Sequence, residues 1–463
     1  MRTVCVKRLP MAVQPRTPPG VLELLPAQQI AFQRMLDTIR RGFERFGFLP
    51  VETPAFELTD VLLTKSGGET EKQVYFVQST GALDQADGKR PELALHFDLT
   101  VPLARYVAEH EHELAFPFRR YQIQRVYRGE RAQRGRFREF YQCDIDVIGK
   151  DALAISYDAE LPAVVHGIFT ALKIGAFTIK INNRKLLRGI LESLDVMPAV
   201  QPAVLHEIDR LGKHDRAAVE SRVGAIIGTP SASRLLELIG APGGATEILA
   251  RLQRFESRSP SYAEGVAELA RVHADTLALG VPSAMLAIDL SIVRGLDYYT
   301  GTVYETFLDA HPGIGSICSG GRYDDLAGHY TRSKLPGVGI SIGATRLFSQ
   351  LLELGLVAAG PRATADVIVL RVDDDLGGDC AAVAAELRGH GWNVEVYGTA
   401  DKLGKQLKYA DRVGVPIAVI VGKREFAAGV VRLKDLRVTD MAARNESEVP
   451  RGHLIDALAD LID

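Results

Sequence analysis

Two segments of the chain carry the side chains best suited to chemistry. Residues 119–138 contain eight arginines and a single acidic residue, Glu130. A solvated surface explains most charge runs, but arginine dominates this one, and its planar guanidinium binds phosphate through two parallel hydrogen bonds. About 165 residues later, residues 294–301 combine an arginine, an aspartate and two tyrosines, which suits a small polar ligand. The pair predicts an enzyme that joins a polyanion to such a ligand.

The overall charge limits how phosphate could be bound. The chain has a net charge of −3, so any nucleic-acid surface must be a local basic patch. No G-x-x-x-x-G-K-[ST] loop occurs in the sequence, which excludes a Walker-type nucleotide site. A nucleotide would therefore have to be held by side chains on strands.

Cysteine usage and apolar patterning favour a cytoplasmic protein. The four cysteines lie far apart, without zinc-ligand spacing or the density of a disulfide scaffold, which favours a reducing compartment. The eleven histidines lack the paired spacing of a metal site, so we expect no protein-bound zinc. No apolar run approaches the ~20 residues that would span a bilayer, and no apolar stretch follows the basic residues of 1–19. We expect neither a membrane span nor a secretory signal.

Hydrophobic spacing predicts the elements that must position the first segment. Residues 28–46 have helical periodicity, and an extended stretch follows through Pro54. Residues 92–147 read largely as strands. The arginine-rich segment lies where two of these strands could be joined by a loop at 131–135. The sequence therefore predicts an antiparallel hairpin here.

The second segment follows a change in character. Residues 186–279 have helical periodicity, which predicts an inserted helical subdomain, with Thr246 as the N-cap of one helix. Strand patterns return over 288–342. A helix is then expected over 344–354, and Gly355 lies just past its end, where glycine readily adopts a left-handed conformation.

The last hundred residues form a separate pattern. Beyond a linker near 356–364, short apolar strands alternate with helical stretches, and 453–462 reads as a closing helix. A segment of about 100 residues is the usual size of an independent core. We expect a separate α/β domain.

Several ordered motifs resemble those of histidyl-tRNA synthetases, a family of class II aminoacyl-tRNA synthetases. The segments are 127–142, which resembles motif 2; 337–346, which resembles motif 3; 294–300 and 316–324, which resemble the two histidine signatures of the family; and 48–54, which resembles part of motif 1. The likeness covers about residues 20–463.

The resemblance implies an α+β fold with three parts. A class II core built on an antiparallel sheet would comprise residues 1–185 and 283–355, interrupted by a helical insertion at 186–282. Residues 365–463 would form an α/β anticodon-binding domain. In the family, motif 1 builds the dimer interface, so the resemblance also implies a homodimer.

The same resemblance implies which residues bind ATP. Arg128 and Arg346 match the ATP-binding arginines of motifs 2 and 3, and Arg136 matches a further triphosphate contact. Glu130 would face the adenine or the metal side. Arg294 matches the arginine that reaches the α-phosphate. The implied catalytic residues are thus Arg294, Arg128 and Arg346, and Mg²⁺ is expected to bind mainly through ATP.

The implied histidine site comes from other strands. Asp146 and Tyr299 match the imidazole end of the pocket, and Tyr298 and Tyr323 would line it. The groups that match the α-amino end are Asp98, Thr100 and Gln142. A histidine substrate needs acceptors for its ammonium and partners for both ring nitrogens, which these residue types provide.

The implied activity activates L-histidine with ATP and transfers it to the 3′ end of tRNA(His). In the tail, basic residues could meet RNA phosphates, and Tyr409 could either belong to the core or stack on a base. These basic residues are Lys402, Lys405, Lys408, Arg412, Lys423 and Arg424.

Two alternatives compete with this interpretation. One is a non-catalytic paralogue that binds histidine and regulates ATP phosphoribosyltransferase, but such relatives typically lose the tail and parts of the 294–299 signature, and this chain keeps both. The other is a class II synthetase for another amino acid, such as threonine or proline. The histidine signatures argue against both of these amino acids, and the missing zinc ligands argue further against threonine.

Overall fold

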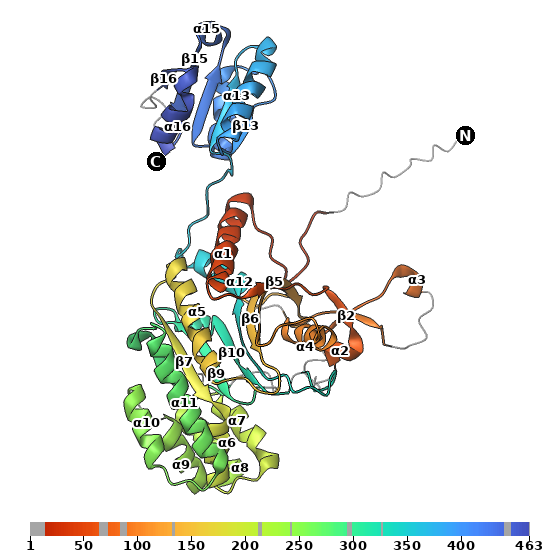
Figure 1. Ribbon diagram of the computed structural model, residues 1–463, viewed down its shortest axis with the longest axis vertical. Helices are drawn as coiled ribbons and strands as arrows, with labels where there is room; N and C mark the ends of the chain where they lie inside the picture. The colour runs from red at the N-terminus through yellow and green to blue at the C-terminus, as the bar shows by residue number, and fades with distance from the viewer. Residues whose placement is uncertain are drawn as a thin grey trace, which may run out of the picture. The chain divides into compact units, whose positions relative to one another are not determined.

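The chain forms two compact units, shown in Figure 1 in the computed structural model of the protein. One unit comprises residues 1–23 and 35–357, and the other 24–34 and 358–463. The residues whose structure is described are 14–63, 73–83, 90–131, 135–211, 215–240, 243–293, 299–325, 327–438 and 446–462. Residues 294–298, which carry most of the first histidine signature, lie outside them.

A large, mostly antiparallel sheet forms the centre of the first unit. Its strands, in spatial order, are β1 (Leu49–Pro50), β5 (Phe118–Tyr127), β6 (Glu139–Ile148), β11 (Gly337–Gly343), β10 (Cys318–Tyr323), β9 (Thr302–Leu308), β7 (Phe177–Asn183) and β8 (Leu286–Ile288). Only the outer pairs, β1–β5 and β7–β8, are parallel among these strands. The predicted antiparallel core is confirmed.

The predicted hairpin is formed by β5 and β6, which pair from Phe118 opposite Ile148 to Tyr127 opposite Glu139. Its connection runs from 128 to 138 and is longer than the turn expected at 131–135. Strand β5 ends at Tyr127 and β6 begins at Glu139, so regular pairing stops before Arg128 and Arg138. The Arg128 N–H still donates to the Arg138 carbonyl at 2.8 Å. The hairpin thus presents a long arginine-bearing loop.

Helices and a small sheet complete this unit. The helices are α1 (Pro26–Glu44), of which residues 35–44 belong to this unit, α2 (Thr59–Leu63), α3 (Thr80–Leu83), α4 (Thr100–Glu109), α5 (Ser156–Leu172) and α12 (Ala344–Glu353). The small sheet has the order β2 (Phe56–Leu58), β4 (Leu93–Leu95), β3 (Tyr75–Val77). Helix α5 packs against β11, and α12 packs against β6. Gly355 ends α12 with φ of 68°, as its position predicts.

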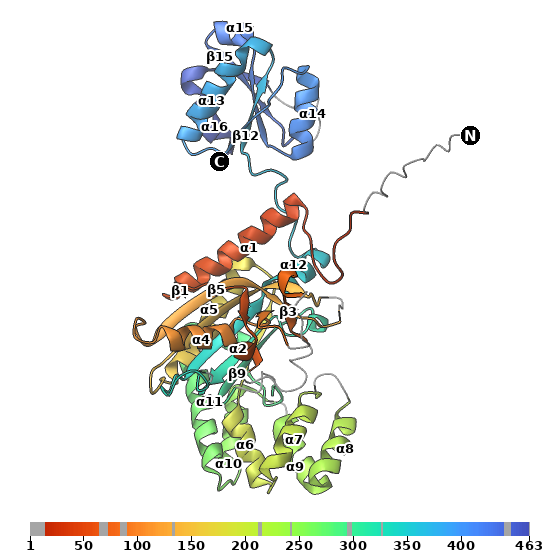
Figure 2. The ribbon, with the colours of Figure 1, turned by 90° about the vertical axis from the view of Figure 1, so that its right-hand side faces the viewer.

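The segment between β7 and β8 is helical, as predicted. It contains α6 (Arg184–Ser193), α7 (Gln201–Ile208), α8 (Arg216–Ile227), α9 (Thr229–Gly240), α10 (Ala245–Arg254) and α11 (Pro260–Ala278), which Figure 2 shows together below the sheet. The predicted N-cap at Thr246 is wrong. Helix α10 is capped at Gly244, because the Glu247 carboxylate reaches back and accepts the Gly244 N–H at 3.1 Å.

The second unit contains a mixed sheet between helices. Its strands run β13 (Val394–Val396), β12 (Val367–Arg371), β14 (Ile417–Val421), β15 (Val430–Asp435) and β16 (Glu446–Pro450), and its helices are α13 (Gly377–Gly389), α14 (Leu403–Val413), α15 (Lys423–Ala427) and α16 (Leu454–Ile462). The central strands β12 and β14 are parallel and buried, with apolar side chains packed on both faces. This agrees with the expected α/β pattern.

Candidate active site

A cavity of about 490 Å³ lies against β6, β9, β10 and β11 and is bordered by the loop that joins β5 to β6. Many of the residues predicted for the site from distant parts of the sequence line it. These are Asp98, Thr100, Arg128, Glu130, Arg136, Gln142, Tyr299 and Arg346. Arg294 and Tyr298 fall outside the described residues, so their predicted roles stay predictions.

Arg128 is held in the cavity wall from three sides. Its Nε donates to the Phe97 carbonyl at 3.0 Å, and its Nη2 donates to Gln142 Oε1 at 3.4 Å. Its guanidinium carbon lies 5.2 Å from the centre of the Phe140 ring. These contacts restrict the side chain before any ligand arrives, which is what binding a phosphate in a fixed geometry requires.

The other cavity arginines lie on the loop and on α12. Arg136 Nη1 contacts Glu130 at 3.4 Å, so the loop carries an internal ion pair. Arg346 donates to the Ile314 carbonyl and lies beside Gly135, where an added Cβ would be 3.9 Å from its Nε. Gly135 has φ of 72°, a conformation that glycine tolerates and a larger residue would strain. The loop and the start of α12 thus bring two further cations to one cavity.

The same cavity also contains carboxylates, whose charge is opposite to that of the arginines. Asp98 lies just before α4, Asp144 lies on β6 and Glu305 lies on β9, and all three are buried residues that line the cavity. Asp98 Oδ1 accepts the Val101 N–H at 3.2 Å, whereas its Oδ2 is buried without a hydrogen-bond partner among the described residues. An orphaned acceptor in a cavity wall is suited to an ammonium or another donor from a ligand.

Asp144 and Glu305 were missed by the sequence reasoning, although each left a signal. Gln142, Asp144 and Asp146 alternate along β6, and alternate residues of a strand share a face, so Gln142 in the site implies Asp144 beside it. Asp144 contacts Gln142 Nε2 at 3.4 Å. Glu305 stands in the otherwise apolar or uncharged run of β9, where a buried charge needs a partner or a function.

Asp146 and Tyr323, both predicted to contact histidine, are not among the residues that line the cavity. The Tyr323 hydroxyl donates to Asp146 Oδ1 at 2.9 Å, and Arg120 Nη2 lies 2.7 Å from Asp146 Oδ2. Both residues are buried. Tyr323 belongs to an apolar cluster against which the cavity residue Tyr299 packs. The pair is therefore linked to the cavity through the packing of Tyr299 against this cluster.

Burial shifts the acidity of these carboxylates. It raises the pKa of Asp98 to about 6, against the opposing effects of the Val101 N–H and the Arg128 charge. It raises the pKa of Asp146 to about 7, although the Arg120 charge acts in the opposite direction. The pKa of Asp144 is raised for the same reason. Asp98 and Asp146 therefore titrate close to neutral pH, where a cationic ligand can keep them ionised.

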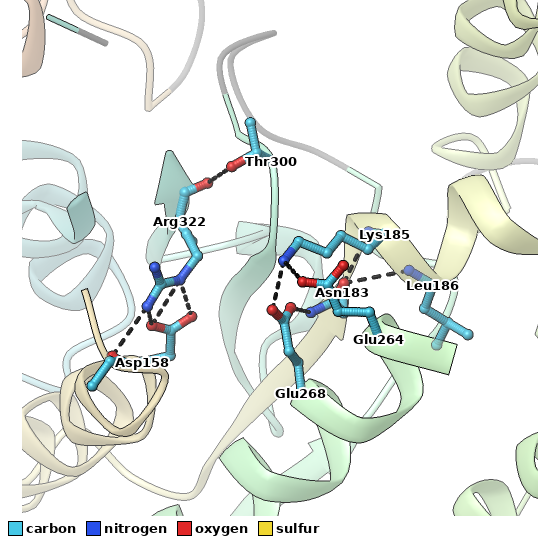
Figure 3. Close-up of polar contacts among 9 residues, drawn as sticks. Asp158, Asn183, Lys185, Leu186, Glu264, Glu268, Thr300 and Arg322 are labelled. Carbon is cyan, nitrogen blue, oxygen red and sulfur yellow. Dashed lines mark hydrogen bonds and ion pairs between the residues drawn. The ribbon is translucent and has the colours of Figure 1, made fainter. Parts of the chain in front are cut away.

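The segment that follows the first histidine signature is fixed by two elements. Figure 3 shows Arg322 bonded to Asp158, with Nη2 at 2.6 Å from Oδ1. The Arg322 carbonyl also accepts the Thr300 N–H at 2.8 Å. On the other side the Arg184 N–H, at the start of α6, donates to the Gly301 carbonyl at 2.8 Å. Residues 300–301 are thereby held between β10 and α6.

Asn183 and Lys185 anchor that start of α6. The Asn183 side chain accepts the Lys185 N–H at 2.8 Å and donates to Glu268 of α11 at 2.7 Å (Figure 3). Lys185 Nζ contacts both Glu264 and Glu268. The cap therefore joins β7, α6 and α11.

The arrangement suits a reaction between an anion and a cationic small molecule. Arginines on the hairpin, its loop and α12 would bind phosphate, and the buried carboxylates would bind a cation. Among the described residues, no three His, Cys, Asp or Glu side chains gather to hold a metal ion. No described helix is long and apolar enough to cross a membrane.

The basic residues predicted to meet RNA lie in the second unit on α14, α15 and the loop before α14. Lys402, Lys408 and Arg412 are exposed there, as is Tyr409. Lys405 forms an ion pair with Asp401 at 2.9 Å, which leaves it less suited to phosphate. Tyr409 stacks edge-on against Tyr397 and donates to Glu395, so it is not free to rotate.

The sequence matches two family models. Residues 20–347 match the model described as histidyl-tRNA synthetase, and residues 366–461 match the model of the anticodon binding domain. A protein of Xanthomonas axonopodis pv. citri, named histidine–tRNA ligase, is 59% identical over 441 residues, covering 92% of each chain. A protein of the same name from Xylella fastidiosa is 56% identical over 460 residues, covering 96% of this chain and 98% of the other.

Solved structures agree with these matches. The crystal structure of histidyl-tRNA synthetase from Nostoc sp. PCC 7120 is 39% identical, superimposes with a TM-score of 0.87, and covers 97% of this chain and all of the other. A Bacillus halodurans structure, titled as an ATP phosphoribosyltransferase regulatory subunit/histidyl-tRNA synthetase, is 21% identical with a TM-score of 0.70, which shows a shared fold alone. This chain belongs to the histidyl-tRNA synthetase family.

Proposed function

We propose that the protein is a histidine–tRNA ligase, which activates L-histidine with ATP and transfers the histidyl group to the 3′ end of tRNA(His). The observation that carries this proposal is a single cavity that combines phosphate-binding arginines with buried carboxylates, in a chain that is 59% identical to a protein of that name. The regulatory alternative is weaker, because this chain matches the anticodon binding domain over 366–461.

In the first step, the carboxylate of histidine attacks the α-phosphate of ATP, and pyrophosphate leaves. Arg128, Arg346 and, by resemblance, Arg294 hold the triphosphate in line and stabilise charge in the transition state. Arg136 and Glu130 contribute from the loop. In the second step, the terminal ribose hydroxyl of the tRNA attacks the carbonyl carbon of the adenylate, and AMP leaves. No side chain forms a covalent intermediate.

The carboxylates and amide would hold the amino acid. Asp98, Thr100 and Gln142 would take the α-ammonium, for which Asp98 Oδ2 is a buried acceptor that has no hydrogen-bond partner among the described residues. Asp146 and Tyr299 would serve the imidazole, with Tyr298 and Tyr323 beside them. Since an imidazole presents a donor at one nitrogen and an acceptor at the other, a carboxylate and a hydroxyl can read both.

Mg²⁺ is proposed to enter with ATP. Glu130 and Glu305 place carboxylate oxygens on the cavity wall, which is the donor type that Mg²⁺ prefers, and the remaining ligands would be phosphates and water. When bound, the ion would neutralise charge on the triphosphate.

The direct test is exchange of pyrophosphate into ATP, measured with each of the twenty amino acids and without tRNA. We expect exchange that depends on L-histidine alone. Histidine binding without exchange would instead identify the regulatory class, and exchange with threonine or proline would identify another synthetase. Aminoacylation of a tRNA(His) transcript then tests the second step.

Histidine use should depend on pH. A carboxylate is ionised only above its pKa, and the pKa values of Asp98 and Asp146 are about 6 and about 7. The KM for histidine should therefore rise roughly tenfold from pH 8 to pH 6, since one pH unit below a pKa leaves about a tenth of the group ionised. Exchange kinetics at each pH measure it, and thermal unfolding at the same pH values controls for loss of structure. A constant KM across this interval would contradict the assignment.

We further propose a cytoplasmic homodimer. Leu49 of β1, in the motif 1 segment, is exposed, and one face of the small sheet exposes Phe56, Leu58 and Leu93 by 53%, 41% and 40%. Leu58 and Leu93 are register partners, so they share that face. Large exposed apolar side chains gathered on one face are typical of a protein interface, and a second copy fits the motif 1 resemblance.

The dimer can be tested with a charge on this face. Leu58→Asp combined with Leu93→Asp should convert the protein from a dimer to a monomer at micromolar concentration, as measured by light scattering after gel filtration. Leu279→Asp is the matched control, because Leu279 is equally apolar and 51% exposed but lies at the end of α11. A monomeric mass for the unmodified protein would overturn the proposal.

A further inference from the structure

The hairpin carries a charged residue with no place in the mechanism above. Arg120 of β5 is 0% exposed, the largest side chain among the fully buried ones described. It does not line the cavity, and it lies opposite Asp146 in the β5–β6 ladder. Its Nη2 lies 2.7 Å from Asp146 Oδ2, and its Nη1 donates to Gln122 Oε1 at 3.3 Å.

Stability alone is a poor explanation for this arginine. Replacing a buried ion pair with apolar side chains is often neutral or stabilising, because the charges must give up their water. Arg120 is also incompletely bonded, since its Nε is buried without a hydrogen-bond partner among the described residues. A buried charge that is costly and imperfectly satisfied is more readily explained by what it does to its neighbour.

The neighbouring sheet is shaped around Asp146 and its partners. Gly339 lies directly opposite Asp146, and a Cβ there would come within 2.0 Å of Asp146 Oδ1. A Cβ on Gly337 would come within 2.4 Å of the Tyr323 ring. Strand β11 therefore leaves room for the Asp146 carboxylate and the Tyr323 ring, which larger residues at these positions would displace.

We propose that Arg120 is a positioning residue for histidine: it holds the Asp146 carboxylate ionised and in place, together with Tyr323, so that Asp146 can bind the imidazole. The inference rests on the proposed function. Arg120 then determines affinity for histidine and leaves affinity for ATP unchanged, because the arginines that would bind phosphate lie on the loop, the end of the hairpin and α12.

The charges around Asp146 give the expected direction of the effect. The groups that act on it are Arg120 of β5, Asp144 of β6, Tyr323 of β10 and Asp98 before α4, while its register partner on β11 is the uncharged Gly339. Arg120 lowers the pKa of Asp146, whereas the two other carboxylates and burial raise it. Without Arg120, the pKa of Asp146 would rise further, so less of the carboxylate would be ionised at neutral pH and its attraction for a donor on the ring would weaken.

The test is pyrophosphate exchange by full-length Arg120→Met, with KM measured separately for histidine and for ATP. We expect the KM for histidine to rise about tenfold or more and the KM for ATP to stay within about twofold, since one unit of pKa corresponds to a factor of ten. The acid limb of kcat/KM for histidine should move upward by about one pH unit or more. Arg120→Lys, which keeps the charge, should recover part of the affinity.

Arg119→Met is the matched control. Arg119 is the next residue of the same strand and forms an ion pair with Glu160, away from the cavity. Its loss should leave the KM for histidine and the pH profile unchanged. Equal changes in both KM values for Arg120→Met, or an unshifted profile, would overturn the proposal.

A second pair of variants decides the matter if Arg120→Met does not fold. Asp144→Asn and the double variant Arg120→Met/Asp144→Asn differ only in Arg120, and the double variant loses one charge of each sign. The proposal predicts a higher KM for histidine in the double variant than in Asp144→Asn, whereas equal values would overturn it. Histidine-dependent exchange by the unmodified enzyme tests the proposed function separately.

Discussion

Arg128→Ala is expected to reduce the rate of histidine-dependent pyrophosphate exchange by about 100-fold to 1,000-fold, the usual loss when one preorganised charge is removed from a transition state. Arg128 lines the cavity and is fixed by the Phe97 carbonyl and the Phe140 ring, so its charge is preorganised there before a ligand binds. Arg128→Lys should recover little, because an ammonium cannot reproduce the fork of a guanidinium. Exchange kinetics at saturating histidine and ATP measure the effect.

Arg125 provides the matched control for this prediction. It lies on β5, three residues before Arg128, and its guanidinium is 5.2 Å from the Tyr141 ring, as that of Arg128 is from the Phe140 ring. Its side chain, however, is 52% exposed, pairs with Glu139 and does not line the cavity. Arg125→Ala should therefore exchange at close to the normal rate. A comparable loss in both variants would show that the arginine-rich strand acts through general charge.

Asp158→Ala should be the most destabilising single change. Asp158 and Arg322 are both buried and joined by Nε and Nη2 contacts, so removing the carboxylate leaves an unpaired guanidinium out of water. Breaking such a pair costs about 3–5 kcal/mol in the free energy of unfolding. The loss should also loosen Thr300, which the Arg322 carbonyl holds, and so raise the KM for histidine. Urea unfolding followed by circular dichroism measures the stability.

The comparison variant for stability is Asp275→Ala. Asp275 forms an ion pair with Arg271 one turn earlier on α11, but Arg271 is 64% exposed. An exposed pair at this spacing contributes only about 0.3–0.5 kcal/mol. If the two variants lost similar stability, the buried Arg322–Asp158 pair would not be what stabilises this part of the site.

Much of the fold follows from local spacing. The apolar positions of 28–46 predict α1, and the alternation of short apolar runs beyond 366 predicts the C-terminal α/β unit, because both patterns depend only on near neighbours. The sequence predicts the N-cap of α10 at Thr246, but the Glu247 carboxylate accepts the Gly244 N–H, so the helix is capped at Gly244. Such ends are set by side-chain rotamers, which spacing does not reveal.

The candidate site, too, could be predicted only in part from the sequence. Residue types within one segment, such as the arginines of 119–138, are enough to predict phosphate chemistry and, through the ordered motifs, the family. They do not show that Arg119 pairs with Glu160 on one side while Arg120, its neighbour, pairs with Asp146 on the other. Strand alternation alone predicts only that the side chains of Arg119 and Arg120 lie on opposite faces of the sheet.

The partners themselves come from strand register, which depends on contacts between distant parts of the chain. Asp146 meets Gly339 across one edge of β6 and Arg120 across the other, and Asp158 meets Arg322, 164 residues later. A shift of one residue in any of these pairings would turn every side chain to the other face. The residue types therefore determine which chemistry the chain can perform. The pKa of each carboxylate, and the guanidinium with which it pairs, are determined only when the sheet forms.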